Sequence, residues 1–170
     1  MNRPMLGSRA LRWLKCFHLL AVSCWVGGAV ALTVLACHRQ FMDDAAALYG
    51  LNVASCVVDM QVVVLPGAYG CLVTGLIYGL FTRFGFFRHG WLILKWIITV
   101  AAILFGMLYL GPWEEALRDL SLELGPDVFT NSEYLRVFSL HSRWGQIQAF
   151  VLVLTIFLSV FKPWKNLRTK

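Results

Sequence analysis

The chain has 170 residues, of which 59% are hydrophobic and 14% are charged. This composition excludes a water-soluble globular domain and a disordered chain. The formal net charge is +6, but the basic residues lie at the ends of apolar runs rather than in one patch, so we expect no nucleic-acid partner. The composition therefore predicts an integral membrane protein whose surface contacts membrane lipid.

Four apolar runs are long enough to cross a hydrocarbon core of about 30 Å as helices. They predict membrane spans at approximately residues 14–36, 60–82, 91–112 and 144–162, which together form a single transmembrane domain over residues 1–170. The fold class that follows is all-α, an integral membrane four-helix bundle.

The connections between the predicted spans differ in charge. The basic residues before the first span, between the second and third, and after the fourth are Arg3, Arg9, Arg12, Lys15, Arg83, Arg88, Lys162, Lys165, Arg168 and Lys170. All nine acidic residues fall in the other two connections or at their edges. Because cytoplasmic loops of membrane proteins are enriched in Lys and Arg, we expect both termini in the cytoplasm, an N-in/C-in topology.

The first span contains an ionisable residue, His18, in an apolar run. An ionisable side chain inside a bilayer is a functional-site hypothesis, and a neutral imidazole ligates metals, including haem iron. At helical spacing His18 shares a face with Lys15 and Trp25. The alternative is a structural histidine that hydrogen-bonds a carbonyl or hydroxyl of a neighbouring helix, and His18 alone does not separate the two.

The connection after the first span combines apolar residues with side chains that bind soft metals, and we expect a short helix at the membrane interface there. Its soft side chains suit Cu(I), so a copper-handling protein is an alternative interpretation. These side chains are Cys37, His38, Met42, Cys56 and Met60. A second metal site at the outer surface, held by His38 and His141, is a further hypothesis.

The second span presents a face of small residues that suits close packing on a helix or on a flat ligand; they are Cys71, Thr74, Gly75 and Gly79. Lys95 lies near the start of the third span, at the depth of His18. It is either a cation that snorkels to the membrane surface or part of the site. A porphyrin beside His18 would direct its propionates toward Lys15 and Lys95 and its ring toward Trp25.

The longest connection separates the third and fourth spans and has helical periodicity. Apolar side chains recur at helical spacing behind Pro112 and ahead of Gly125, while Glu114 and its acidic neighbours fall on the other side. This pattern predicts an amphipathic surface helix that lies flat on the outer surface, with Glu114 facing water.

Several positions resemble one family of small membrane proteins. The first span carries Lys15-x-x-His18 with Trp25 and Gly28 further on, the third opens with Trp91-x-x-x-Lys95, and the last follows Arg143 and ends at Lys162-Pro163-Trp164. This set is similar to that of the HemJ-type protoporphyrinogen IX oxidases and the related CopD-like membrane proteins. In that family a small helical bundle binds b-type haem.

The resemblance implies His18 as the iron ligand of haem b. It implies Lys95 as a catalytic residue that anchors porphyrin or quinone, and it adds Arg143 to the cofactor site. This chain departs from the family at Gly106, where the third helix of the family carries a further His, and at Gly145–Gln146, which replace an Asn-Glu pair. These departures bear on porphyrinogen oxidation more than on the bundle or the haem.

The function that we expect is binding of b-type haem or porphyrin in the bacterial inner (cytoplasmic) membrane, with a redox role. If the protein is an enzyme, the resemblance implies protoporphyrinogen oxidation coupled to quinone. A copper-handling membrane protein is one alternative. A cofactor-free accessory subunit, bound to a partner subunit or to a second copy of this chain, is another.

Overall fold

The computed structural model describes residues 6–82 and 89–163. Every regular element in these two ranges is helical, so the predicted all-α class is confirmed. The elements are α1 (Ser8–Arg39), α2 (Ala45–Val58), η1 (Asp59–Tyr69), α3 (Gly70–Phe81), α4 (Gly90–Phe105), η2 (Gly106–Leu110), α5 (Gly111–Leu124), η3 (Gly125–Phe129) and α6 (Ser132–Phe161). Four helices in the described ranges are long and apolar enough to cross a membrane, as predicted.

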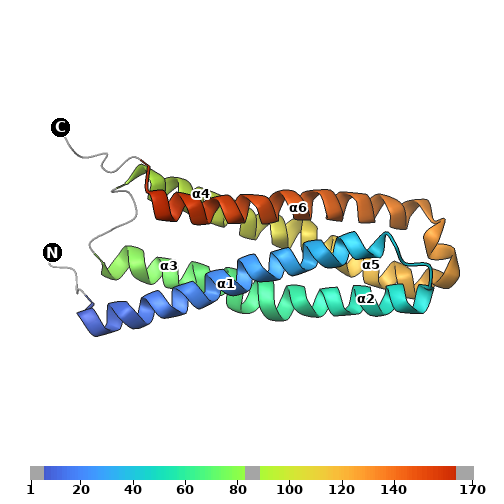
Figure 1. Ribbon diagram of the computed structural model, residues 1–170, viewed down its shortest axis with the longest axis horizontal. Helices are drawn as coiled ribbons and strands as arrows, with labels where there is room; N and C mark the ends of the chain where they lie inside the picture. The colour runs from blue at the N-terminus through green and yellow to red at the C-terminus, as the bar shows by residue number, and fades with distance from the viewer. Residues whose placement is uncertain (1–5, 83–88, 164–170) are drawn as a thin grey trace.

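The elements join into four long helices that lie side by side, with both ends of the described chain at the same end of the molecule (Figure 1). The helix made of α2, η1 and α3 packs along α1, and α6 packs against α1 on another side. The third long helix consists of α4, η2 and α5. Its α5 part contacts α2 and α6, and its α4 part contacts α6. We call the half that holds α3 and α4 the terminal half and the half that holds α2, α5 and η3 the distal half.

Two of the helices contain segments of wide π-type turns and continue without a break. Pro66 lies inside η1, and Pro112 is the second residue of α5, two residues after η2 ends. Proline cannot donate a backbone hydrogen bond, and its ring clashes with the carbonyl four residues earlier in an α-helix. Wider turns relieve this clash, so the helices pass both prolines without ending.

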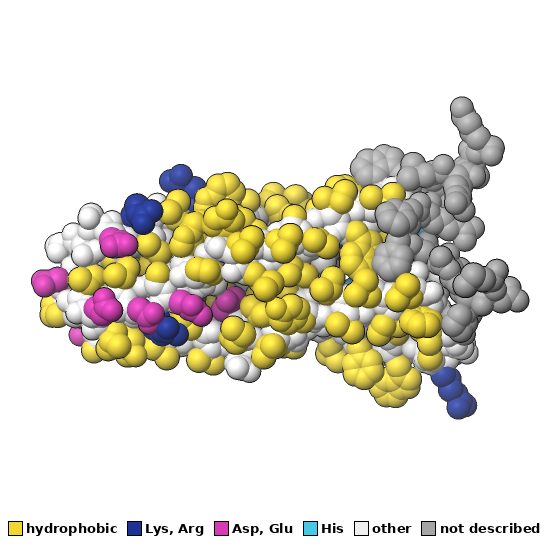
Figure 2. All heavy atoms as spheres, turned by 180° about the vertical axis from the view of Figure 1, so that it is seen from behind, with side chains coloured by type: hydrophobic (Ala, Val, Ile, Leu, Met, Phe, Trp, Pro, Cys, Tyr) yellow, Lys and Arg dark blue, Asp and Glu magenta, His cyan; other side chains and the backbone are white. Residues whose placement is uncertain are grey.

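The helices are longer than a bilayer is thick. The 37 residues of Ala45–Phe81 extend over about 55 Å at about 1.5 Å per residue, against a hydrocarbon core of about 30 Å. Acidic side chains gather at the distal end of the surface, and hydrophobic side chains cover much of the remainder (Figure 2). The bundle therefore extends beyond a single bilayer thickness at its acidic end.

The predicted flat surface helix is wrong in its placement. The amphipathic segment exists as α5, but it continues α4 directly and packs between α2 and α6. Leu117 on its apolar face is fully buried in a distal core with Leu48, Val128 and Val137. The helix expected at the interface after the first span is likewise upright, as α2. Since each apolar stripe meets another helix, neither segment needs to lie on the lipid surface.

A second core holds the middle of the bundle together, where Trp25 packs with Val63 and Ala68. The backbones of η1 and α1 meet at Gly67, where a Cβ atom would lie 2.8 Å from both the Cα and the N of Trp25. A Cβ atom at Gly28 would lie 2.6 Å from Cγ2 of Val63. These two glycines let α1 and η1 pack backbone against backbone.

Candidate functional site

His18 projects from α1 toward α3 in the terminal half. Its Nδ1 lies 2.7 Å from the hydroxyl oxygen of Thr74. Its half-buried ring and that of Tyr78 form a T-shaped pair, with ring centroids 5.7 Å apart and an angle of 77° between the planes. Thr74 belongs to the small-residue face predicted for the second span, so that face packs against the helix that carries His18.

The partners of Thr74 determine which nitrogen of His18 carries the proton. The Thr74 hydroxyl lies 2.5 Å from the carbonyl oxygen of Gly70 and 3.3 Å from that of Cys71, and it donates its single proton to them. It can therefore only accept from His18, so Nδ1–H is the donor and the neutral ring keeps a lone pair on Nε2.

This arrangement fits the donor chemistry of a haem ligand. A metal-bound histidine usually uses one ring nitrogen for the metal and donates a hydrogen bond from the other, which fixes the tautomer and the ring orientation. The two cavities described below have volumes of about 40 Å³ each and are not lined by His18. The fit to haem therefore rests on the donor chemistry of His18 and not on either cavity.

The two lysines predicted for the site lie in the terminal half. Lys95 is half-buried in α4, and its positive charge acts on the His18 ring. Lys15 precedes His18 by about one helical turn and is exposed. The side chain of Trp96, next to Lys95, approaches α3, because a Cβ atom at Gly75 would lie 3.5 Å from its ring. Helix α4 thus brings Lys95 toward His18 and Trp96 toward α3, while Lys15 lies on the same helix as His18.

Trp25 and Arg143, the other predicted cofactor residues, lie elsewhere. Trp25 is only 5% exposed; it belongs to the middle core and lines one cavity. Arg143 is exposed on α6, next to Ser142, which shares a cavity with Thr33 of α1. That level is roughly 20 Å along α1 from His18 at about 1.5 Å per residue. The structure therefore does not bring Arg143 to His18.

The proposed copper ligands are scattered in the distal half. Cys37 and His38 are exposed on α1, whereas the Cys56 thiol lies 3.6 Å from the backbone carbonyl of Glu114 and donates to it. Within residues 6–82 and 89–163, no three or more His, Cys, Asp or Glu side chains form a group that could hold a metal ion. His141 does not pair with His38 but is buried against Glu114.

The sequence did not predict the buried ionic group of the distal half, which we call the distal polar cluster: Arg39, Glu114 and His141. The guanidinium of Arg39 donates to both carboxylate oxygens of Glu114. Nε2 of His141 lies 2.8 Å from Oε2 of the same carboxylate. Glu114 is only 1% exposed, so the prediction that it faces water is wrong.

A second buried polar network lies beside this cluster and is centred on Asn52 of α2. Its side-chain nitrogen donates to the Leu117 carbonyl at 3.1 Å and to the Ser121 hydroxyl at 3.0 Å, and it lies 3.3 Å from the Tyr134 hydroxyl. These bonds join α2, α5 and α6 at one level. The distal half thus has a core in which polar layers alternate with apolar ones.

Helical spacing carries the signal that could have located these groups. Glu114, Leu117 and Ser121 occupy positions i, i+3 and i+7 of α5 and are all buried. Tyr134, Val137 and His141 have the same spacing on α6 and are buried too. The buried stripe of α5 therefore includes the carboxylate of Glu114, which the apolar pattern by itself assigned to the opposite face.

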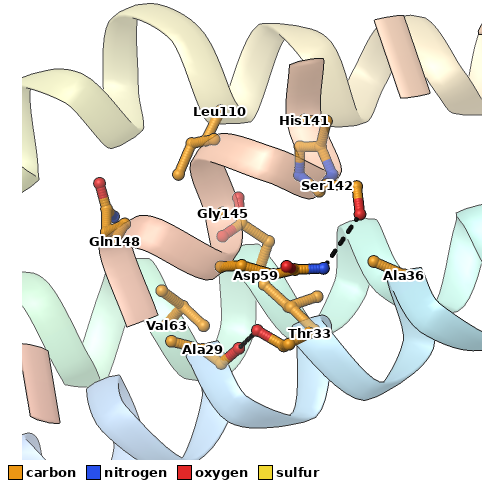
Figure 3. A pocket seen from close by; sticks show the side chains of 12 residues that line it. Ala29, Thr33, Ala36, Asp59, Val63, Leu110, His141, Ser142, Gly145 and Gln148 are labelled. Carbon is orange, nitrogen blue, oxygen red and sulfur yellow. Dashed lines mark hydrogen bonds between the residues drawn. The ribbon is translucent and has the colours of Figure 1, made fainter. Parts of the chain in front are cut away.

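Two small cavities lie along the π-type segments, and Figure 3 shows one of them. The cavity of Figure 3 is bordered by α1, η1, η2 and α6, and its polar lining residues are Thr33, Asp59, His141, Ser142, Gln146 and Gln148. The second cavity is lined by residues of α1, η1, α4, η2 and α6, and it shares Asp59, Val63, Leu110 and Gln148 with the first.

The fold defines an all-helical protein with four helices able to span a membrane, a half-buried histidine at one end and buried ionic groups at the other. Comparison of the chain with protein-family models, with curated proteins and with solved structures finds no match.

Proposed function

We propose that this chain is a b-type haem- or porphyrin-binding protein of the bacterial inner membrane with a redox role, and that Nε2 of His18 is the iron ligand. One observation carries the proposal: the hydrogen bond from Nδ1 of His18 to Thr74 leaves Nε2 with a free lone pair. The resemblance to the HemJ-type oxidases and CopD-like proteins agrees with this assignment.

The other residues of the terminal half have supporting roles in this proposal. Thr74 holds the imidazole in one orientation, while Lys15 and Lys95 are cations for the propionate groups. Haem, when bound, supplies one-electron chemistry. Lys95 is also the proposed contact for an oxidisable porphyrin or for quinone, and protoporphyrinogen oxidation is the candidate activity.

Charge supports an N-in/C-in orientation of the bundle. Arg9, Arg12, Lys15 and Lys162 all lie near the end that holds the chain termini. The other basic residues used for the topology prediction lie outside the described residues: Arg3, Arg83, Arg88, Lys165, Arg168 and Lys170. The acidic end would then face the outer side of the membrane.

The test is the visible absorption spectrum of the full-length protein, purified in detergent after expression with a haem supply. We expect a Soret band that His18→Ala abolishes and that His38→Ala, a change at an exposed histidine, leaves intact. Size-exclusion chromatography and thermal unfolding show whether both variants keep the fold. Haem content that is unchanged in a folded His18→Ala protein would remove His18 as the ligand.

A second candidate, the cofactor-free accessory subunit, is favoured by the same hydrogen bond, because it ties α1 to α3 without any ligand. In that case the purified protein is colourless. His18→Ala and Thr74→Val then lower thermal stability by similar amounts, since each removes one partner of the bond. His18→Asn, which keeps a side-chain donor, would restore part of that stability, whereas it would not restore a Soret band.

A further inference from the structure

The cavity of the distal half contains two groups that both accept hydrogen bonds. Its volume of about 40 Å³ has room for about three water molecules. His141 lines it from α6, and Asp59 extends toward α6 from η1 (Figure 3). Neither residue has a role in the function proposed above.

The imidazole of His141 is oriented by Glu114. Its Nε2–H donates to Oε2 of Glu114 at 2.8 Å, which leaves the lone pair of the neutral ring on Nδ1. Among the described residues Nδ1 has no hydrogen-bond partner, and only 8% of the side chain is exposed. A buried acceptor without a donor is costly, so this nitrogen points to a ligand that brings a proton.

The charges around the cavity leave one negative charge uncompensated. Arg39 from α1 balances Glu114 from α5, while Asp59 from η1 has no cation of its own within the distal polar cluster. Two further charges of α5 act on this region: Glu115 is exposed, and Arg118 is paired with Asp119 at 2.8 Å. One positive charge would neutralise the buried groups, and a divalent cation would overcompensate them.

We propose that Asp59 and His141 together bind one exchangeable proton, shared through water in the cavity between them. A hydronium ion from the distal side transfers its proton to the Asp59 carboxylate or to Nδ1 of His141 and leaves as water; release is the reverse. Glu114 and Arg39 keep the imidazole oriented and remain a neutral pair. The site is independent of haem binding, because it lies in the other half of the bundle.

The test is a pH titration of the full-length protein in nanodiscs, with ¹⁵N-labelled histidine followed by NMR and carboxyl groups followed by infrared spectroscopy. His141→Gln identifies the resonances of His141. In the wild type we expect the cavity to take up one proton as the pH falls, seen at Nδ1 of His141 or at the Asp59 carboxyl group. In Asp59→Asn this uptake should be lost over the same pH range, because the carboxylate that shares the proton is gone.

Matched variants separate a shared proton from a general change in structure. Asp59→Glu keeps the charge and should keep the wild-type titration, and Glu123→Gln, at an exposed carboxylate of α5, should not change it. Overlapping histidine titrations in the wild type and Asp59→Asn, with no protonated-carboxyl band assigned to Asp59, would overturn the proposal. A titration that shifts when sodium replaces choline at equal ionic strength would assign the charge to a metal cation and overturn it too.

Discussion

The backbone of Gly67 lies directly against the backbone of Trp25, so no side chain fits between α1 and η1 at this point. We expect Gly67→Ala to destabilise the protein by about 1–3 kcal/mol, the usual cost of overpacking a core. Gly27→Ala is the matched control, because its Cβ would meet nothing within 4 Å. Unfolding in detergent with increasing denaturant measures both, and equal midpoints would contradict the close contact.

The second prediction concerns Thr74 and depends on haem binding at His18. Thr74→Val removes the acceptor of the Nδ1–H bond with little change in volume, so the imidazole loses its fixed orientation. Loss of such a supporting bond typically weakens metal affinity by about 10- to 100-fold. Thr74→Ser keeps the hydroxyl and should keep the affinity. Haem titration followed by absorption tests this, and equal affinity in both variants would exclude Thr74 from this role.

The third prediction addresses the distal polar cluster. Glu114→Ala leaves the buried Arg39 charge without its partner, and we expect a loss of about 3–5 kcal/mol in the free energy of unfolding. The triple variant Arg39→Met/Glu114→Leu/His141→Phe removes all three polar groups together. Its free energy of unfolding should be much closer to that of the wild type. Denaturant unfolding compares them. A triple variant less stable than Glu114→Ala would contradict this assignment.

An exposed ion pair of the same helix provides the control for that series. Arg118 and Asp119 are also paired, but their side chains are 36% and 57% exposed. Water already solvates both charges, so Asp119→Ala should leave the unfolding midpoint unchanged.

The fourth prediction concerns the Asn52 network. Asn52→Ala removes the donor shared by α5 and α6 and leaves the Leu117 carbonyl and the Ser121 hydroxyl without it. We expect the free energy of unfolding to fall by about 1–3 kcal/mol. Tyr134→Phe removes only the longest contact and should cost about 1 kcal/mol or less. A larger effect for Tyr134→Phe than for Asn52→Ala in denaturant unfolding would contradict this order.

The fifth prediction tests the orientation of the bundle. In a cysteine-free background, a cysteine at Asp43, which is exposed between α1 and α2, should react with a membrane-impermeant maleimide added to intact cells. A cysteine at Arg9 should react only after the cells are permeabilised. The opposite pattern would reverse the N-in/C-in topology.

The long apolar runs predicted the four helices because each run is long enough to cross a bilayer, a property of the local sequence. The placement of α5 could not be predicted in the same way. Its apolar stripe fits a lipid surface or another helix equally well, and only the folded chain shows that α2 and α6 cover it.

The candidate sites could be predicted only in part, because their contacts join residues that are far apart in the sequence. His18 was identified as an ionisable residue in an apolar run, and Thr74 as part of a small-residue face, but their pairing joins positions 56 residues apart. The amphipathic pattern of residues 113–124 predicts Glu114 on the side that faces water. Its burial depends on Arg39, which is 75 residues away.

The unbroken helix from Gly90 to Leu124 has a geometric consequence. It carries Lys95 near one end and the acidic side chains of α5 at the other, with the π-type turns of η2 between them. Because no loop interrupts this helix, helical geometry sets the separation between Lys95 and the acidic side chains of α5, at about 1.5 Å per residue.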